Sequence, residues 1–108
     1  MANRQIERLD DGSYRLHGDL DFTTVPQIWR ESLEIFRAGA TLSIDLAAVG
    51  RADSAGLALL IGWVKRAAEQ GGQPLFKNIP AQLLAIARVS GVETMLPLPN
   101  QVTNEVTT

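Results

Sequence analysis

An apolar segment from Ala55 to Val64 constrains the fold of this chain more than any other feature. It directly follows Asp53 and Ser54, whose side-chain oxygens are suited to accept hydrogen bonds from the free backbone N–H groups at a helix start. Leucines recur at helical spacing, and a Gly-Gly pair ends the pattern. The sequence therefore predicts a helix over residues 54–70. Its apolar part is far shorter than the roughly 20 residues that cross a bilayer, so it must be covered by protein.

The start of this helix has two interpretations. Asp53 or Ser54 can simply cap the helix, which is the ordinary role of these residue types. The same free N–H groups, together with the positive end of the helix dipole, also favour a bound anion or a covalent phosphate. The residues alone leave both interpretations open.

Strands and helices alternate along the chain. Two short strands around an Asp-Asp-Gly turn predict an N-terminal β-hairpin. Thr23 or Thr24 is placed to cap a first helix that Gly39 ends. The whole pattern predicts the α/β class, with a mixed β-sheet and helices packed on it. The expected strands are residues 5–9, 13–17, 41–46, 74–77 and a last short one at 95–98, and the later helices are residues 54–70 and 80–90.

Length and composition limit the class of protein. A chain of 108 residues with 45% hydrophobic content suits one domain, which we place at residues 1–98, and we expect the polar tail at residues 99–108 to fray. Ten Lys and Arg against twelve Asp and Glu give a net charge of -2 without a basic stripe, so neither nucleic acid nor direct membrane insertion is expected. The polar N-terminus is unlike a signal peptide, and we expect a cytoplasmic protein.

Signatures of catalysis are missing from the sequence. The chain has no cysteine and a single histidine, and it has neither a phosphate-binding loop nor a serine-nucleophile elbow. A magnesium-dependent phospho-acceptor domain needs an acidic pair directly after the first strand, whereas Asp10 and Asp11 lie in the expected hairpin turn. We therefore expect no enzymatic activity, no metal ion and no cofactor.

Four aspartates and one serine lie near the ends of the expected strands. Because the loops at the carboxyl ends of parallel strands form the functional edge of such a sheet, we expect these residues to lie close together. The group consists of Asp19, Asp21, Asp45, Asp53 and Ser54.

The second expected helix has two apolar sides. The expected core side carries Leu57, Leu60, Ile61, Val64 and Ala68 at helical spacing. The opposite side is more apolar, and richer in small residues, than a solvated face should be. We expect it to form a partner-binding site that consists of Asp53, Ser54, Ala55, Ala58, Leu59, Gly62, Trp63 and Arg66. The alternative is that Leu59 and Trp63 pack against neighbouring helices of the same domain.

Three elements of the sequence together resemble the STAS domain, a family named for sulphate transporters and anti-sigma factor antagonists. They are Gly18-Asp-Leu-Asp21, the strand Leu42-Ser-Ile-Asp-Leu46, and Asp53-Ser-Ala-Gly-Leu57 with the helix that follows. The resemblance covers about residues 5–98. It implies a mixed sheet with helices, no catalysis, and function through a bound partner. In the regulatory branch a partner kinase phosphorylates the serine of the motif, which corresponds to Ser54.

Two branches of this family are candidates. Residues 51–67 and 20–26 most resemble the stand-alone STAS subunit of a bacterial phospholipid-transport ABC system. That resemblance implies a protein that binds the transporter's ATPase subunit, lies at the inner membrane only through this partner, and helps to maintain the lipid asymmetry of the outer membrane. The second candidate is an anti-sigma factor antagonist, whose partner is an anti-sigma factor kinase and whose regulation is phosphorylation of Ser54. A self-standing anion-binding module is a third class, although the sequence offers no basic clamp for it.

Overall fold

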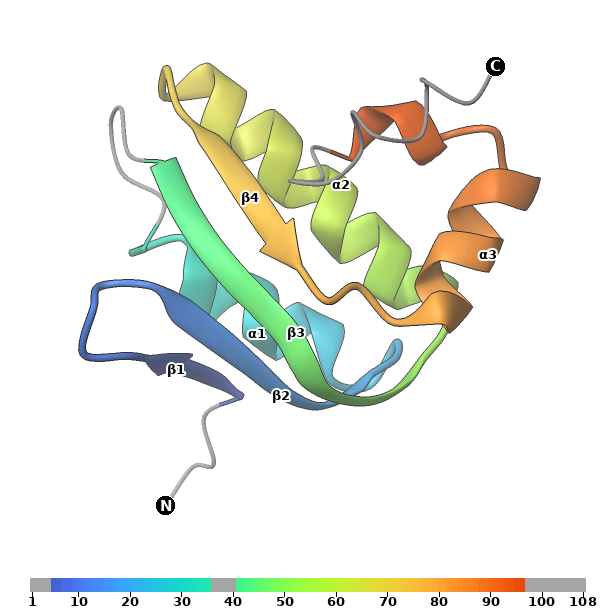
Figure 1. The fold of residues 1–108 in the computed structure, drawn as a ribbon, viewed down its shortest axis with the longest axis horizontal. Helices are drawn as coiled ribbons and strands as arrows, with labels where there is room; N and C mark the ends of the chain where they lie inside the picture. Colours follow the sequence, from blue (N-terminus) through green and yellow to red (C-terminus); the bar gives the residue numbers. More distant parts are fainter. Residues whose placement is uncertain (1–4, 36–40, 97–108) are drawn as a thin grey trace.

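The computed structural model describes residues 5–35 and 41–96 as one sheet with helices packed on it (Figure 1). The four strands lie in the order β1-β2-β3-β4. Along the chain the elements are β1 (Ile6–Arg8), β2 (Tyr14–Leu20), α1 (Val25–Ser32), β3 (Thr41–Ala52), α2 (Ser54–Glu69), β4 (Gln73–Lys77), α3 (Ala81–Val89) and a short 3-10 helix, η1 (Glu93–Met95).

The sheet is mixed, as the sequence predicted. β1 and β2 form the expected antiparallel hairpin, whereas β2 pairs with β3, and β3 with β4, in parallel. Gly12 in the hairpin turn has a φ of 89°, a conformation that favours glycine. The α/β class and the N-terminal hairpin are therefore confirmed.

One face of the sheet is covered by helices. Figure 1 views the sheet with α1 and α2 behind it, and α2 lies between α1 and α3. The side chains that point to this face form one core, in which Ile44 of β3 pairs in register with Phe76 of β4. The largest fully buried side chains are Trp63, Phe76, Leu16, Leu20, Ile28, Leu46, Leu60, Leu83 and Leu96, with Pro74 and Ser32.

The other face of the sheet carries a row of alternating charges. Glu7 of β1 pairs with Arg15 of β2, Arg15 with Asp45 of β3, and Asp45 with Lys77 of β4. Opposite charges at directly paired positions stabilise neighbouring strands by a few tenths of a kcal/mol to about 1 kcal/mol each. The side chains of this row are exposed or half-buried, so the described helices leave this face of the sheet open.

Three strand predictions were wrong. The second strand was expected to end at His17, whereas β2 continues to Leu20. β3 does not end at Leu46 but continues to Ala52, because its second half pairs with β2, with Val49 opposite Gly18. Exposed small residues in this half hide the alternation that marks a strand. The strand expected at residues 95–98 is also absent in its described part, since Met95 belongs to η1 and residues 97 and 98 lie outside the described ranges.

The predicted bounds of the helices agree more closely with the structure than those of the strands. α2 and α3 lie within a residue of the expected bounds, and α1 follows Thr24 as expected. However, α1 ends at Ser32 rather than at Gly39, and its fully buried residues are Ile28 and Ser32. Gly39 and the tail at residues 99–108 lie outside the described ranges. None of the helices in those ranges has both the length and the apolar character of a membrane span.

Candidate functional site

The start of α2 has a cap and a separate, free hydroxyl. Asp53 has an extended backbone, and its Oδ1 accepts a hydrogen bond from the Ala55 N–H at 2.8 Å. Ser54 is the first helical residue and is exposed, and its hydroxyl makes no hydrogen bond within residues 5–35 and 41–96. Asp53 therefore caps the helix, which was one of the two interpretations that the sequence left open. The Ser54 hydroxyl is available to a partner or to modification, which was the other.

Three successive backbone N–H groups before Ser54 are each held by a different group. Two acceptors belong to β2 and one is a side-chain amide of α3. The bonds run from Arg51 N to Asp19 Oδ1 (2.9 Å), from Ala52 N to Gln82 Oε1 (3.0 Å) and from Asp53 N to Leu20 O (3.1 Å). Because β2 and α3 both fix this turn, the position of Ser54 is set by the sheet and the third helix together.

Gly56 explains why the motif has glycine two residues after the serine. A Cβ at this position would lie 2.9 Å from Leu20 Cβ, 3.3 Å from the Leu20 carbonyl oxygen and 3.4 Å from Leu83 Cδ2. Such distances to a backbone atom are shorter than ordinary contacts, so only glycine lets α2 approach the end of β2. The Asp-Ser-x-Gly spacing thus combines a cap, a free hydroxyl and a close helix–strand contact.

Asp21 orders the neighbouring loop between β2 and α1. Its Oδ1 accepts hydrogen bonds from Thr23 Oγ1 (2.6 Å), Thr23 N (2.9 Å) and Thr24 N (3.1 Å). These bonds, that from the Thr23 hydroxyl first, hold the pKa of Asp21 below its ordinary value. Thr24 occupies the N-cap position of α1, as one of the two expected residues. However, its side chain makes no capping hydrogen bond, so the predicted threonine cap was wrong.

A hollow of about 340 Å³ lies between the ends of β2 and β3 and the start of α3. Asp19, Asp21 and Asp53, expected together from the sequence, all line it. Phe22 also lines it, and this side chain is 77% exposed. Sequence reasoning missed Phe22, Arg51 and Gln82 as site residues. Phe22 and Arg51 adjoin the motif residues, but no local signal identifies Gln82, because its bond joins positions 30 residues apart.

Asp45 does not belong to this site. It lies where β4 ends, and its Oδ1 accepts hydrogen bonds from Asn78 Nδ2 and Ala47 N, both at 2.9 Å. The Asn78 amide first, then the Ala47 N–H, hold the pKa of Asp45 below its ordinary value. The prediction that grouped Asp45 with Asp53 was wrong because β3 continues beyond it to Ala52.

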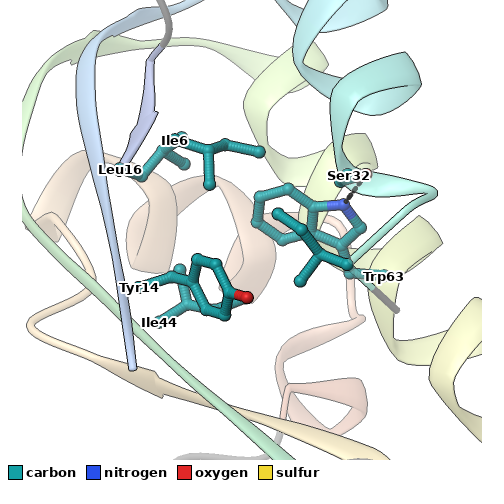
Figure 2. Close-up of a pocket in the computed structure, with 7 residues that line it drawn as sticks. Ile6, Tyr14, Leu16, Ser32, Ile44 and Trp63 are labelled. Carbon is teal, nitrogen blue, oxygen red and sulfur yellow. Dashed lines mark hydrogen bonds between the residues drawn. The ribbon is translucent and has the colours of Figure 1, made fainter. Parts of the chain in front are cut away.

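The middle of α2 is not an exposed partner-binding face. Leu59 and Trp63 are 2% and 1% exposed, so the alternative that they pack within the domain is correct. Trp63 donates its indole N–H to the Ser32 hydroxyl of α1 at 2.7 Å (Figure 2). At Gly62 a Cβ would lie 3.0 Å from Trp29 Cζ3, which shows that α1 is in direct contact with α2.

The expected division of α2 into a core side and a partner side therefore needs correction. Because α2 has α1 on one flank and α3 on the other, it is buried on more than one side. Leu57 and Leu60 are buried as expected, but Ala68 is exposed. Of the predicted partner-binding residues, the exposed Asp53, Ser54 and Ala58 and the half-buried Ala55 remain at the helix start, whereas Arg66 lies about three turns away along α2.

A small apolar cavity lies inside the core beside Trp63 (Figure 2). Its volume is about 10 Å³, roughly the room that a single water molecule requires. It is lined by Ile6, Tyr14, Leu16, Ser32, Ile35, Ile44 and Trp63. This space is too small for a lipid chain or another organic ligand. Another hollow, of about 200 Å³, lies between α2, β4 and η1, but none of the motif residues line it. The hollow that Asp53 lines is therefore the candidate site. In the described part of the chain, no three acidic or histidine side chains are placed to hold a metal ion.

The STAS family, described as "Mlab, STAS domain", matches residues 7–97. The chain therefore belongs to the STAS domain family, whose members generally act by binding partner proteins. No curated protein sequence matches it significantly.

Two anti-sigma factor antagonists are among the solved structures that share the fold. An anti-sigma factor antagonist from Mycobacterium paratuberculosis is 21% identical, with 94% of this chain and 88% of that chain covered and a TM-score of 0.66. The anti-sigma factor antagonist SpoIIAA in its unphosphorylated form is 22% identical, with 95% of each chain covered and a TM-score of 0.62.

Proposed function

We propose that this protein is a non-catalytic STAS subunit that binds and supports the ATPase of a phospholipid-transport ABC system, which maintains the lipid asymmetry of the outer membrane. The observation that carries the proposal is the match of residues 7–97 to the family described as Mlab. The sequence similarity of residues 20–26 and 51–67 to the stand-alone subunit of such transporters points the same way. The protein would lie at the cytoplasmic side of the inner membrane through its partner.

The geometry at the start of α2 suits a protein–protein contact. Ser54 and Ala58 are exposed on the same side of the helix, one turn apart, and small side chains let a partner backbone approach closely. The turn before them is fixed by side chains of β2 and α3, so the contact surface is preorganised and loses little entropy on binding. We therefore place the partner contact at Asp53, Ser54, Ala55 and Ala58, next to the hollow.

An anti-sigma factor antagonist is the second candidate, favoured by the free Ser54 hydroxyl. A kinase can reach this exposed group, and a phosphate on it would lie at the helix N-terminus, where negative charge is stabilised. The same phosphate would add about -1.5 to -2 charges beside Asp53, and its bulk and the cost of removing its water would oppose a closely packed partner. Phosphorylation at Ser54 would thus switch partner binding off.

Affinity purification of the protein from its own cells, with phosphatases inhibited, separates the two candidates. The transporter proposal expects the ABC ATPase and its permease among the retained proteins and Ser54 unmodified by mass spectrometry. A retained kinase-like anti-sigma factor, together with a fraction of phosphorylated Ser54 that changes with growth condition, would instead establish the antagonist. A Leu83→Asp variant, with a charge in the core, serves as the control for capture by unfolded protein.

A further inference from the structure

The hollow beside Ser54 has an exposed aromatic ring at its rim. Phe22 lies in the loop between β2 and α1 and is 77% exposed, whereas the other residues of the described chain that are large, apolar and exposed, Val89 and Met95, are not aromatic. A phenylalanine side chain that stays in water forgoes the free energy that its burial would contribute. Aromatic side chains at the rim of a concave surface are typical anchors for a binding partner.

The hollow is also strongly acidic. Its lining includes three carboxylate residues, Asp19, Asp21 and Asp53, and one arginine, Arg51. Each carboxylate accepts a hydrogen bond from a backbone N–H through its Oδ1, and no bond to its Oδ2 occurs in the described residues. Three carboxylate oxygens therefore keep their capacity to accept hydrogen bonds from a bound group. A partner surface that fits this charge has to be basic.

We propose that the hollow receives a basic side chain of the partner protein, an arginine or lysine, with its aliphatic stem on the Phe22 ring and its charged head toward the three carboxylates. The inference rests on the proposed function and adds the chemistry of the partner's contact group. A cation within about 6 Å of an aromatic ring is attracted to the ring face, and carboxylates beside it add charge-assisted hydrogen bonds. Neither a neutral apolar segment nor an acidic one uses both features of the hollow.

Photo-crosslinking tests this contact in the cell. Phe22 is replaced by the photoreactive p-benzoyl-phenylalanine, which keeps an aromatic ring at that position, and exposed Val89 at the far end of α3 receives the same residue as the control. We expect position 22 to crosslink to a partner peptide that carries Arg or Lys, and position 89 not to crosslink to that peptide. No crosslink from position 22, or a crosslink only to a second copy of this chain, would overturn the inference.

A double-mutant cycle then tests the basic residue that the crosslink identifies. With the purified partner, Phe22→Ala is expected to weaken binding about tenfold or more, and neutralisation of the basic residue should cost less in the Phe22→Ala background than in the wild type. Additive effects of the two changes would contradict a direct contact.

Charge-neutral variants complete the test. Asp19→Asn and Asp21→Asn keep the Oδ1 acceptor and remove the charge, so they should weaken binding a few-fold and make it less sensitive to salt, whereas Asp10→Asn in the hairpin turn should not. If the crosslinked partner is an anti-sigma factor kinase and the coupling holds, the proposed function fails and this inference stands. If the transporter ATPase binds but is insensitive to Phe22 and these charges, the inference fails and the proposed function stands.

Discussion

Trp63 donates its indole N–H to the Ser32 hydroxyl across 2.7 Å, and this bond ties α2 to the last turn of α1. The Ser32 hydroxyl in turn donates to the Trp29 carbonyl oxygen at 2.7 Å, and Ser32 is fully buried. Ser32→Ala removes the acceptor of a bond in the core, and we expect the free energy of unfolding to fall by about 1–3 kcal/mol. Urea denaturation measures this change. Ser13→Ala, in the exposed hairpin turn, is the control, and an equal loss in both variants would contradict the role of the Trp63–Ser32 bond.

The structure of the start of α2 predicts different effects on stability for alanine substitutions at two neighbouring residues. Asp53→Ala removes the helix cap and should lower the free energy of unfolding by about 1 kcal/mol. Ser54→Ala should leave stability nearly unchanged, because Ser54 lies inside the helix and alanine is the better helix former. Thermal unfolding of both variants checks this difference. A larger loss for Ser54→Ala than for Asp53→Ala would show that the serine is the cap.

Gly56 is expected to tolerate no side chain. Alanine favours a helix over glycine by about 1 kcal/mol, but here its Cβ would come within 2.9 Å of Leu20 Cβ and 3.3 Å of the Leu20 carbonyl oxygen. The strain of overpacking should exceed the gain, with a net loss of about 1–2 kcal/mol in chemical denaturation. Gly71→Ala, where the new Cβ meets nothing within 4 Å but φ is 81°, separates backbone strain from packing. A Gly56→Ala protein as stable as the wild type would contradict the close approach of α2 to β2.

Acid sensitivity should follow the three aspartates whose pKa values are lowered, Asp11, Asp21 and Asp45. Hydrogen bonds to Asp21 and Asp45 hold the pKa of each below its ordinary value in the folded protein. The unfolded chain therefore binds protons first as the pH falls, so this stabilisation is complete above about pH 4 and is lost as the pH falls through the lowered values. Unfolding measured between pH 6 and pH 2 should show a steeper decline for the wild type than for Asp45→Asn. Parallel curves would contradict the contribution of Asp45.

The sequence predicted the local features of the fold well, because they depend on residues close together in the chain. Residues within a few positions of one another predict the hairpin, α2 and α3. The same holds for the motif at Asp53, Ser54 and Gly56. The extension of β3 to Ala52 was not predictable in this way, since it depends on pairing with β2, and the distant partner decides how far the strand runs.

The surface of α2 was harder to predict for a different reason. A helix with neighbours on both flanks has no single apolar stripe, so an apolar side facing α1 is indistinguishable in sequence from one facing a partner. Trp63 was therefore assigned to a surface it does not occupy. Gln82 reaches Ala52 N from α3 without any local pattern, and only the folded chain shows that α3 helps to hold the turn before Ser54.

The central claim is that the edge around Ser54 binds the ATPase of a phospholipid transporter. Calorimetric titration of the purified protein with that ATPase tests it most directly, with the wild type, Ser54→Glu and the control Glu69→Gln at the far end of α2 compared. We predict saturable binding by the wild type and the control, and binding at least about tenfold weaker for Ser54→Glu. The longer, charged side chain would obstruct the close contact that the small residues allow and would have to lose its water there, whereas the helix start itself tolerates the charge. Absence of wild-type binding, or equal affinities for the wild type and Ser54→Glu, would contradict the account.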